Sequence, residues 1–219
     1  MKHSTQNYLK AIYQLSELDG KTTVKVNDLA KKLSISMPAV SEMMKRLESD
    51  GYVKIKPYKG VSLTAKGKDL GVTMVRHHRI WETYLWSVLG FTWDEVHDEA
   101  ELLEHASSNK VIDRLESLMD YPQFDPHGNP IPDSKGHLPI IKNEQLLSTC
   151  VVGDSCSIVR FVDLDSSYLT FLLQHGIAPN SKLIITEILA FDGTLVCDIN
   201  GQSFHFSSQA SNQIFVLLK

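Results

Sequence analysis

The residue types best suited to chemistry lie together in one short stretch, VHDEAELLEH at positions 96–105, which holds two histidines and four carboxylates. On a helix, residues three or four positions apart share a face, so Glu101, Glu104 and His105 are expected to lie together. Carboxylate oxygens and imidazole nitrogens suit a divalent transition metal. The alternative is a solvated acidic face, although like charges at this spacing repel each other and weaken an isolated helix.

A second candidate pair, His78 and Glu82, lies four residues apart in a segment with a broad apolar face from Met74 to Leu89. Such a pair can chelate a metal, but taken alone the spacing favours an ordinary surface ion pair. The apolar face is wider than a small core requires, so part of it is a candidate dimer surface.

Two short helices in the N-terminal part predict a nucleic-acid contact. The first begins at Val26 or Asn27, and a tight turn over residues 34–36 leads to the second. Pro38 fits the first turn of that second helix, because its missing N–H would be unpaired there anyway. Two helices joined by so short a turn are typical of a helix-turn-helix.

A β-hairpin, or wing, is predicted to follow at residues 53–63, where apolar residues alternate with lysines. Lysines can contact phosphates, which position a protein on DNA without reading its sequence. Glu42 on the second helix can accept a hydrogen bond from a cytosine amino group. The residues expected to face DNA are Ser36, Pro38, Ala39, Ser41, Glu42, Lys45 and Lys59. The alternative for this region is a helical protein-interaction domain.

The distribution of charge agrees with a nucleic-acid partner. Residues 1–74 carry 13 Lys and Arg against 7 Asp and Glu, a net +6, whereas the remainder carries 9 against 19, a net −10. A basic part joined to an acidic part suggests DNA at the basic end. No apolar run is long enough for a bilayer, the N-terminus has no signal core, and the three cysteines form no C-x-x-C pair. We therefore expect a cytoplasmic protein without a membrane partner.

Further helices and strands are expected around these motifs. A helix over residues 4–17 can be capped by Ser4 or Thr5, and later helices by Thr64 and Thr92. The Pro- and Gly-rich segment 121–139 predicts a linker or an ordered irregular loop. Beyond residue 140, five short strands and one helix predict a small all-β domain. The expected fold is mainly α with that β domain, divided at 1–74, 75–139 and 140–219.

Several of these segments, in this order, resemble the DtxR/MntR family of metal-dependent repressors, of the diphtheria-toxin-repressor type. The similar segments are YLKAIYQL, SMPAVSEMMKRLE, SLTAKGKDLG, RHHRIWETYL, VHDEAELLEH and PHGNPIP. The resemblance implies a winged helix-turn-helix, a helical domain for metal binding and dimerisation, and an SH3-like (FeoA-like) barrel. It also implies a repressor rather than an enzyme, whose homodimer binds double-stranded operator DNA to control metal-uptake genes.

The resemblance also implies metal ligands, beginning with a primary site. Glu101, Glu104 and His105 match its core ligands, and Asn7 stands where members have Met or Asp. Lys10 stands where some manganese-type members have a second carboxylate, which argues against a two-metal cluster of that kind. We expect two further candidate ligands near this site, His3 and Asp125.

A second, ancillary site is implied by His78, Glu82 and His97. Of two further positions in the C-terminal domain, Arg160 cannot bind a metal and Asp163 can. The ligands contain no sulfur, so Mn²⁺ is favoured over Fe²⁺ as the cofactor. Two alternatives remain: a winged-helix regulator that responds to an organic ligand and uses the acidic helix only structurally, and a metallohydrolase. The second lacks an H-E-x-x-H motif.

Overall fold

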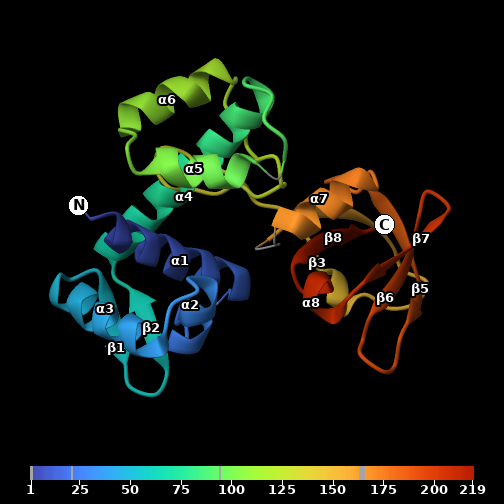
Figure 1. Ribbon diagram of the computed structural model, residues 1–219, viewed down its shortest axis with the longest axis horizontal. Helices are drawn as coiled ribbons and strands as arrows, with labels where there is room; N and C mark the ends of the chain where they lie inside the picture. The colour runs from blue at the N-terminus through green and yellow to red at the C-terminus, as the bar shows by residue number, and fades with distance from the viewer. Residues whose placement is uncertain (1, 21, 94, 163–165) are drawn as a thin grey trace. The chain divides into compact units, whose positions relative to one another are not determined.

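The computed structural model describes residues 2–20, 22–93, 95–162 and 166–219 (Figure 1). The chain forms two compact units. Unit 1 comprises Met1–Trp81, Glu101–Ser117 and Pro132–Leu138, and unit 2 comprises Glu82–Ala100, Leu118–Ile131 and Pro139–Lys219. The division into three domains at residues 74 and 139 stays a prediction. In the described part of the chain, no helix is both long enough and apolar enough to cross a membrane.

The helix-turn-helix in unit 1 is built from helices α1 (His3–Asp19), α2 (Val26–Lys32) and α3 (Met37–Ser49). Helix α1 begins earlier than predicted: Lys2 occupies the cap position without a side-chain hydrogen bond, so the expected cap by Ser4 or Thr5 is wrong. The early start adds His3 to the helix. Gly20 ends α1 in the left-handed conformation, which glycine adopts without steric cost.

Helix α3 begins as predicted, with Pro38 in its first turn, and the side chain of Ser36 caps it. Its inward face is apolar, because Val40, Met44 and Leu47 are buried in the core shared with α1 and α2. The wing consists of the antiparallel strands β1 (Val53–Lys56) and β2 (Gly60–Leu63).

The long helix α4 (Ala65–Ser87) starts at Thr64, whose hydroxyl accepts a hydrogen bond from the amide of Gly67 at 3.1 Å. Helix α1 crosses α4 closely at Gly71, where a Cβ atom would lie 2.8 Å from the main-chain oxygen of Leu9. No larger residue fits there without moving α1, so Gly71 brings the α1 side chains close to α4.

Helices α5 (Val96–Glu104) and α6 (Asn109–Leu118) follow. Helix α5 begins at Val96, four residues after Thr92, which was expected to cap it. The main-chain amide of Thr92 donates to the Glu95 carboxylate at 2.9 Å, which is one of the two hydrogen bonds of a capping box. Within unit 1, the buried Arg76 of α4 binds α6 through Asp113 at 2.9 Å and Glu116 at 2.7 Å.

The C-terminal part of unit 2 is a six-stranded antiparallel sheet in the order β3-β8-β4-β5-β6-β7. The strands are β3 (Gln145–Leu146), β4 (Ser155–Phe161), β5 (Lys182–Ile188), β6 (Leu195–Ile199), β7 (Gln202–Phe206) and β8 (Ile214–Leu218). The five longer strands were predicted, whereas β3 has only two residues and no detectable period. The expected fold class, mainly α with a small all-β C-terminal domain, is confirmed.

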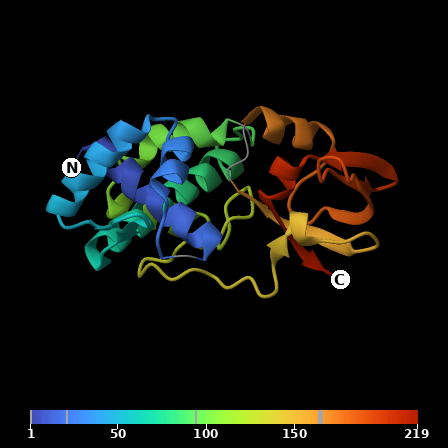
Figure 2. The same cartoon turned by 90° about the horizontal axis from the view of Figure 1, so that it is seen from below.

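Helix α7 (Ser166–Gln174) covers one side of this sheet, as Figures 1 and 2 show from two directions. Leu169 and Leu172 of α7 are buried in the core of the sheet. A 3₁₀ turn (Leu147–Thr149) and the short helix α8 (Ser208–Ser211) complete the domain. Its three cysteines are free and buried, and burial raises the pKa of Cys156 and Cys197 to about 12. These thiols therefore serve as core side chains.

Candidate metal centres and nucleic-acid interface

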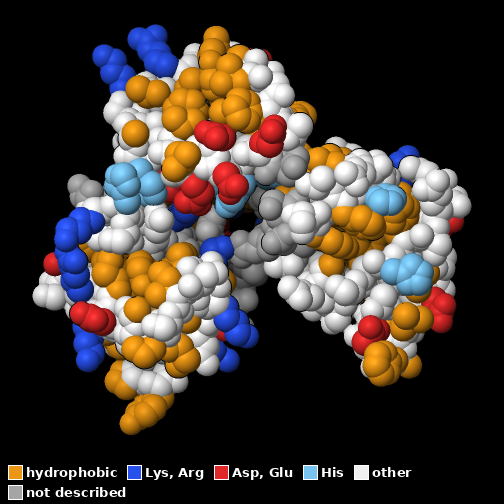
Figure 3. Space-filling view, in the orientation of Figure 1, with side chains coloured by type: hydrophobic (Ala, Val, Ile, Leu, Met, Phe, Trp, Pro, Cys, Tyr) orange, Lys and Arg blue, Asp and Glu red, His pale blue; other side chains and the backbone are white. Residues whose placement is uncertain are grey.

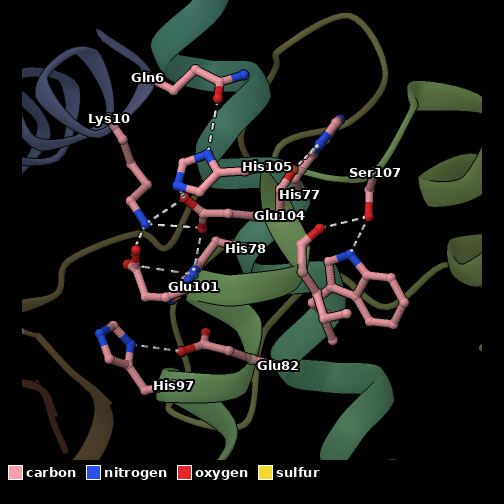
Figure 4. A network of polar contacts seen from close by, with 12 residues as sticks. Gln6, Lys10, His77, His78, Glu82, His97, Glu101, Glu104, His105 and Ser107 are labelled. Atoms are coloured by element: carbon pink, nitrogen blue, oxygen red, sulfur yellow. Dashed lines mark hydrogen bonds and ion pairs between the residues drawn. The ribbon is translucent and has the colours of Figure 1, made fainter. Parts of the chain in front are cut away.

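Glu101, Glu104 and His105, here called the α5 cluster, do meet as the helical spacing predicts. One donor atom from each lies within 4.8 Å of the others. Figure 4 shows the three side chains gathered at the C-terminal end of α5. The Glu104 side chain is fully buried, whereas the Glu101 side chain is 34% exposed. Two carboxylates so close to each other require a positive partner.

The ring of His105 is oriented by a residue of α1. Its Nδ1 atom donates to the side-chain oxygen of Gln6 at 2.9 Å, and the ring stacks on His3 with the centroids 4.6 Å apart. The neutral ring therefore directs the lone pair of Nε2 to the other side, where Oε1 of Glu104 lies 3.5 Å away. Burial lowers the pKa of His105 more than nearby Glu104 raises it. His105 is thus held in the neutral form that binds metals.

Two further residues of unit 1 bind the same carboxylates. His78 on α4 donates from Nδ1 to Oε2 of Glu104 at 2.7 Å. The ammonium group of Lys10 contacts Glu101 and lies 2.8 Å and 2.9 Å from the two oxygens of Glu104. The Lys10 side chain is only 6% exposed. The α5 cluster therefore contains a cationic group supplied by the protein itself.

Asn7 lies one turn of α1 before Lys10, and its side-chain oxygen has an unusual environment. Its Oδ1 atom is buried and has no hydrogen-bond partner among the described residues. Most buried polar atoms are paired, so an unpaired one is a candidate for binding a missing group. Joined to the two carboxylates and the imidazole of the α5 cluster, an amide oxygen would complete a hard donor set that fits Mn²⁺ or Fe²⁺.

A second group, here called the loop cluster, consists of Glu82, Asp125 and His127. All three are buried, and one donor atom from each lies within 4.8 Å of the others. Glu82 comes from α4, whereas Asp125 and His127 come from the irregular loop that follows α6. Both clusters offer only oxygen and nitrogen donors.

His127 is held so that one ring nitrogen faces the cluster. Its Nε2 atom lies 3.2 Å from the main-chain oxygen of Trp93, which can only accept, so Nε2 carries the proton. In the neutral ring, Nδ1 then presents a lone pair towards Oε1 of Glu82, 3.8 Å away. Two acceptors facing each other favour a proton or a metal ion between them. Histidines that bind metals commonly donate their other ring N–H to a main-chain oxygen in this way.

The loop backbone is held in place on both sides of His127. Oδ1 of Asp125 accepts from the amides of His127 at 2.8 Å and Asn129 at 2.9 Å. Gly128 has a φ of +86°, and a Cβ atom there would lie 2.1 Å from the oxygen of Val159. The close packing on β4 therefore requires glycine, and it fixes the residues that flank it.

The structure describes three of the residues expected in the ancillary site, namely His78, Glu82 and His97. Glu82 lies beside His97, with 3.3 Å between Oε1 and Nδ1, and near His127. His78 binds Glu104, in the α5 cluster. Asp163 lies outside the described residues, and Arg160 forms a two-point ion pair with Glu144 at 2.9 Å. Asp125, expected near the primary site, belongs to the loop cluster.

The sequence interpretation missed His127. The available signal was its position two residues after Asp125 in the D-P-H-G segment, but a loop without periodicity does not show where its side chains point. It also left open the direction of Lys10, which turns out to bind Glu101 and Glu104.

The proposed DNA-facing residues are all exposed on α3 and the wing. Those on and beside α3 are Ser36, Pro38, Ala39, Ser41, Glu42 and Lys45, and the one in the wing is Lys59. Lys54 and Lys56 are exposed on β1 as well. Figure 3 shows Lys and Arg side chains along the outer edge of this region. The face therefore combines small residues on a helix with positive charge around it, which suits a DNA groove and its phosphates.

Comparison with known families divides the chain into three matches. Residues 1–61 match the N-terminal DNA-binding domain of iron-dependent repressors, and residues 64–133 match the metal-binding and dimerisation domain of the same proteins. Residues 145–218 match the FeoA domain. The helix-turn-helix thus lies in the first match, and all residues of the α5 cluster and of the loop cluster lie in the second.

Individual relatives agree over most of the chain. The iron-dependent repressor IdeR of Mycobacterium tuberculosis is 33% identical over 193 residues, 83% of each protein. The diphtheria toxin repressor of Corynebacterium diphtheriae is 29% identical over 221 residues, 96% of this chain and 95% of that protein.

Solved structures are similar along the whole chain. A manganese-dependent transcriptional repressor in complex with manganese has a TM-score of 0.89 at 34% identity, covering 98% of this chain and 100% of the other. The manganese regulator SloR has a TM-score of 0.85 at 33% identity, with both chains fully covered. These similarities favour the metal-dependent regulator over one that responds to an organic ligand. The chain belongs to the DtxR/MntR family of metal-dependent transcriptional repressors, which Mn²⁺ or Fe²⁺ activates.

Proposed function

We propose that this repressor binds a palindromic operator as a homodimer when Mn²⁺ is held by the loop cluster and the α5 cluster, and that it controls metal-uptake genes. The observation that carries the proposal is the loop cluster, in which Glu82, Asp125 and His127 are buried together. Three ionisable residues are seldom buried at one point unless they bind a partner.

The ligands proposed for the loop cluster are Glu82, Asp125 and His127, with His97 at its edge. Asp125 is oriented by two loop amides and His127 by the oxygen of Trp93, so these side chains are positioned before an ion binds. The His97 side chain is 53% exposed, so it can complete the coordination without being buried first. Asp163 stays a proposed further ligand.

The ligands proposed for the α5 cluster are Glu101, Glu104, His105 and Asn7. A divalent ion supplies the positive charge that two adjacent carboxylates need. Asn7 projects from α1 and the other three from α5 and the residue after it, so binding ties the helix-turn-helix to the helical domain. His78 supports the site through its hydrogen bond to Glu104.

The absence of sulfur from both donor sets supports Mn²⁺ over Fe²⁺. Carboxylate and carbonyl oxygens suit Mn²⁺, whereas soft thiolate and thioether ligands select other ions. Fe²⁺ also accepts oxygen and nitrogen ligands, so the two ions are best distinguished by measured affinity under anaerobic conditions.

Operator binding by a homodimer is supported by two surfaces. Exposed apolar residues follow one another at the end of α4, namely Trp86, Val88 and Leu89. Exposed apolar groups in a helical domain are typical of subunit interfaces. A twofold dimer would present two copies of α3, which fit half-sites about 34–36 Å apart in successive turns of DNA.

The experiment that tests this function is an anaerobic titration of the metal-free protein with Mn²⁺ and Fe²⁺. Fluorescence anisotropy would follow its binding to labelled DNA from upstream of metal-uptake genes in its own genome. We expect binding only with metal, and a loss of that response in Glu82→Gln. Metal-independent binding of equal strength would instead support a regulator with an organic ligand.

A further inference from the structure

The ammonium group of Lys10 occupies the position between the carboxylates of the α5 cluster. It contacts Glu101 and both oxygens of Glu104, the latter at 2.8 Å and 2.9 Å. Both Lys10 and Glu104 are buried. An ion pair that is buried on both sides is far less screened by water and salt than a pair on the surface.

A divalent ion and this ammonium group need the same oxygens. Metals approach carboxylate oxygens to about 2.0–2.6 Å, so an ion bound to Glu104 would lie within a few ångströms of Nζ if Lys10 stayed in place. At such a separation, two positive charges repel each other strongly wherever water is largely excluded. Occupation by the metal therefore requires the ammonium group to leave.

We propose that Lys10 is an internal cation that competes with the divalent ion for Glu101 and Glu104, and so sets the metal concentration at which the α5 cluster fills. The loop cluster has imidazoles rather than an ammonium group beside Glu82, namely His97 at 3.3 Å and His127 at 3.8 Å. A neutral imidazole has a ring nitrogen that can bind a metal where it stands, whereas an ammonium group has only donors and must move away from the carboxylates. The loop cluster then fills first and the α5 cluster second.

The competition gives Lys10 a place in regulation. Lys10 lies on α1, and its bonds to Glu104 tie that helix to α5 in the absence of an ion. When a metal replaces the ammonium group, the ion pair between α1 and α5 is lost. Metal coordination by Asn7 of α1 and by Glu101, Glu104 and the ring of His105 then connects the two helices. Lys10 therefore keeps the α5 cluster free of metal until the metal concentration is high.

The test is a Mn²⁺-binding isotherm measured without DNA, with free Mn²⁺ followed by electron paramagnetic resonance. We expect the wild-type chain to show one tight and one weaker class of site. Lys10→Met should tighten the weaker class by about 10- to 100-fold, the range typical when groups beside metal ligands are changed. Lys10→Arg keeps the charge, and Lys68→Met removes an exposed positive charge from α4, so both should stay within about twofold of wild type.

If folded Lys10→Met bound Mn²⁺ no more tightly than wild type, the proposal would be overturned. Weaker binding would mean that Lys10 positions the carboxylates for the metal instead of competing with it. A second measurement needs no variant: crystals of the wild type soaked in rising Mn²⁺ concentrations. Metal on Glu104 should appear only as Nζ of Lys10 leaves, and both present at full occupancy would contradict the competition. The inference rests on the proposed ligands, but neither measurement contains DNA, so it can fail separately from metal-dependent operator binding.

Discussion

His127 and Glu82 face each other across 3.8 Å, with Nδ1 of the imidazole directed towards Oε1 of the carboxylate. The other ring nitrogen is committed to the oxygen of Trp93, so the neutral ring has only a lone pair to offer Glu82. This geometry makes His127 a ligand that is already oriented. We expect His127→Ala to lower the affinity of the loop cluster for Mn²⁺ by at least about 100-fold, since even supporting residues contribute 10- to 100-fold. Isothermal titration calorimetry measures the change.

The matched control for that variant is His137→Ala. The His137 side chain is largely exposed and pairs with Asp133, four residues away. Its removal should leave the Mn²⁺ isotherm unchanged. An equal loss of affinity in both variants would mean that the loop as a whole, and not the His127 ring, determines binding.

Asn7 provides a prediction in which stability and affinity change in opposite directions. Its buried Oδ1 atom has no partner among the described residues, which costs free energy in the metal-free protein. Asn7→Leu should therefore raise the free energy of unfolding of the metal-free chain by about 1 kcal/mol and weaken Mn²⁺ binding at the α5 cluster. Urea unfolding without metal and a Mn²⁺ titration give the two values. Asn7→Asp should do the opposite in both measurements, and parallel changes would count against Asn7 as a ligand.

The lowered pKa of His105 predicts how acid affects the metal-free protein. Burial is the main cause, so the folded chain holds a proton on this ring less tightly than the unfolded chain, whose pKa is about 6.5. Between the two pKa values the unfolded state binds more protons, and the free energy of unfolding rises with pH. Stability is therefore lost as pH falls from about 6.5 through the folded pKa. Replacing His105 with Gln should flatten this part of the stability profile, and an unaltered slope would assign it to other groups.

Two DNA-facing residues provide a prediction that distinguishes contacts to phosphates, which position the protein on DNA, from contacts to bases, which recognise the DNA sequence. Lys59 is exposed in the wing, so Lys59→Ala should weaken binding to all DNA sequences alike and reduce the slope of log K against log salt by about 1. Glu42 is exposed on α3 and should affect only the preferred sequence: Glu42→Ala should relax discrimination by about 1–3 kcal/mol at one base pair. Measurements at several salt concentrations distinguish the two. A sequence-dependent effect of Lys59→Ala would contradict its assignment to phosphate.

The helical parts of this protein were predictable because their patterns are local. Pro38 marked the start of α3, and the lysines marked the wing. The spacing of Glu101, Glu104 and His105, at the end of α5 and directly after it, brought these three residues together. The start of α1 was not predictable from capping preferences, because Lys2 provides no side-chain cap. There the packing of α1 in the core outweighs the missing cap.

The loop cluster could not be predicted from periodicity, because two of its residues lie in an irregular segment. Their positions depend on contacts far along the chain: the Phe161 amide donates to the His127 oxygen at 3.0 Å, and Gly128 packs on Val159. The contact of Lys10 with Glu104 could not be predicted for a related reason. A sequence places a lysine on a helix, but only the tertiary structure shows that its ammonium group is buried against Glu104.

The most direct test of the central claim combines metal stoichiometry with operator binding in one anaerobic Mn²⁺ titration. Wild type would be compared with Glu82→Gln, Glu104→Gln and the control His137→Ala. The account predicts that operator binding in wild type and in His137→Ala rises as Mn²⁺ fills the clusters. It also predicts that each of the other two variants loses bound Mn²⁺ and shifts or loses the rise. Operator binding that is the same in all four proteins and does not depend on Mn²⁺ would show that neither cluster is the switch.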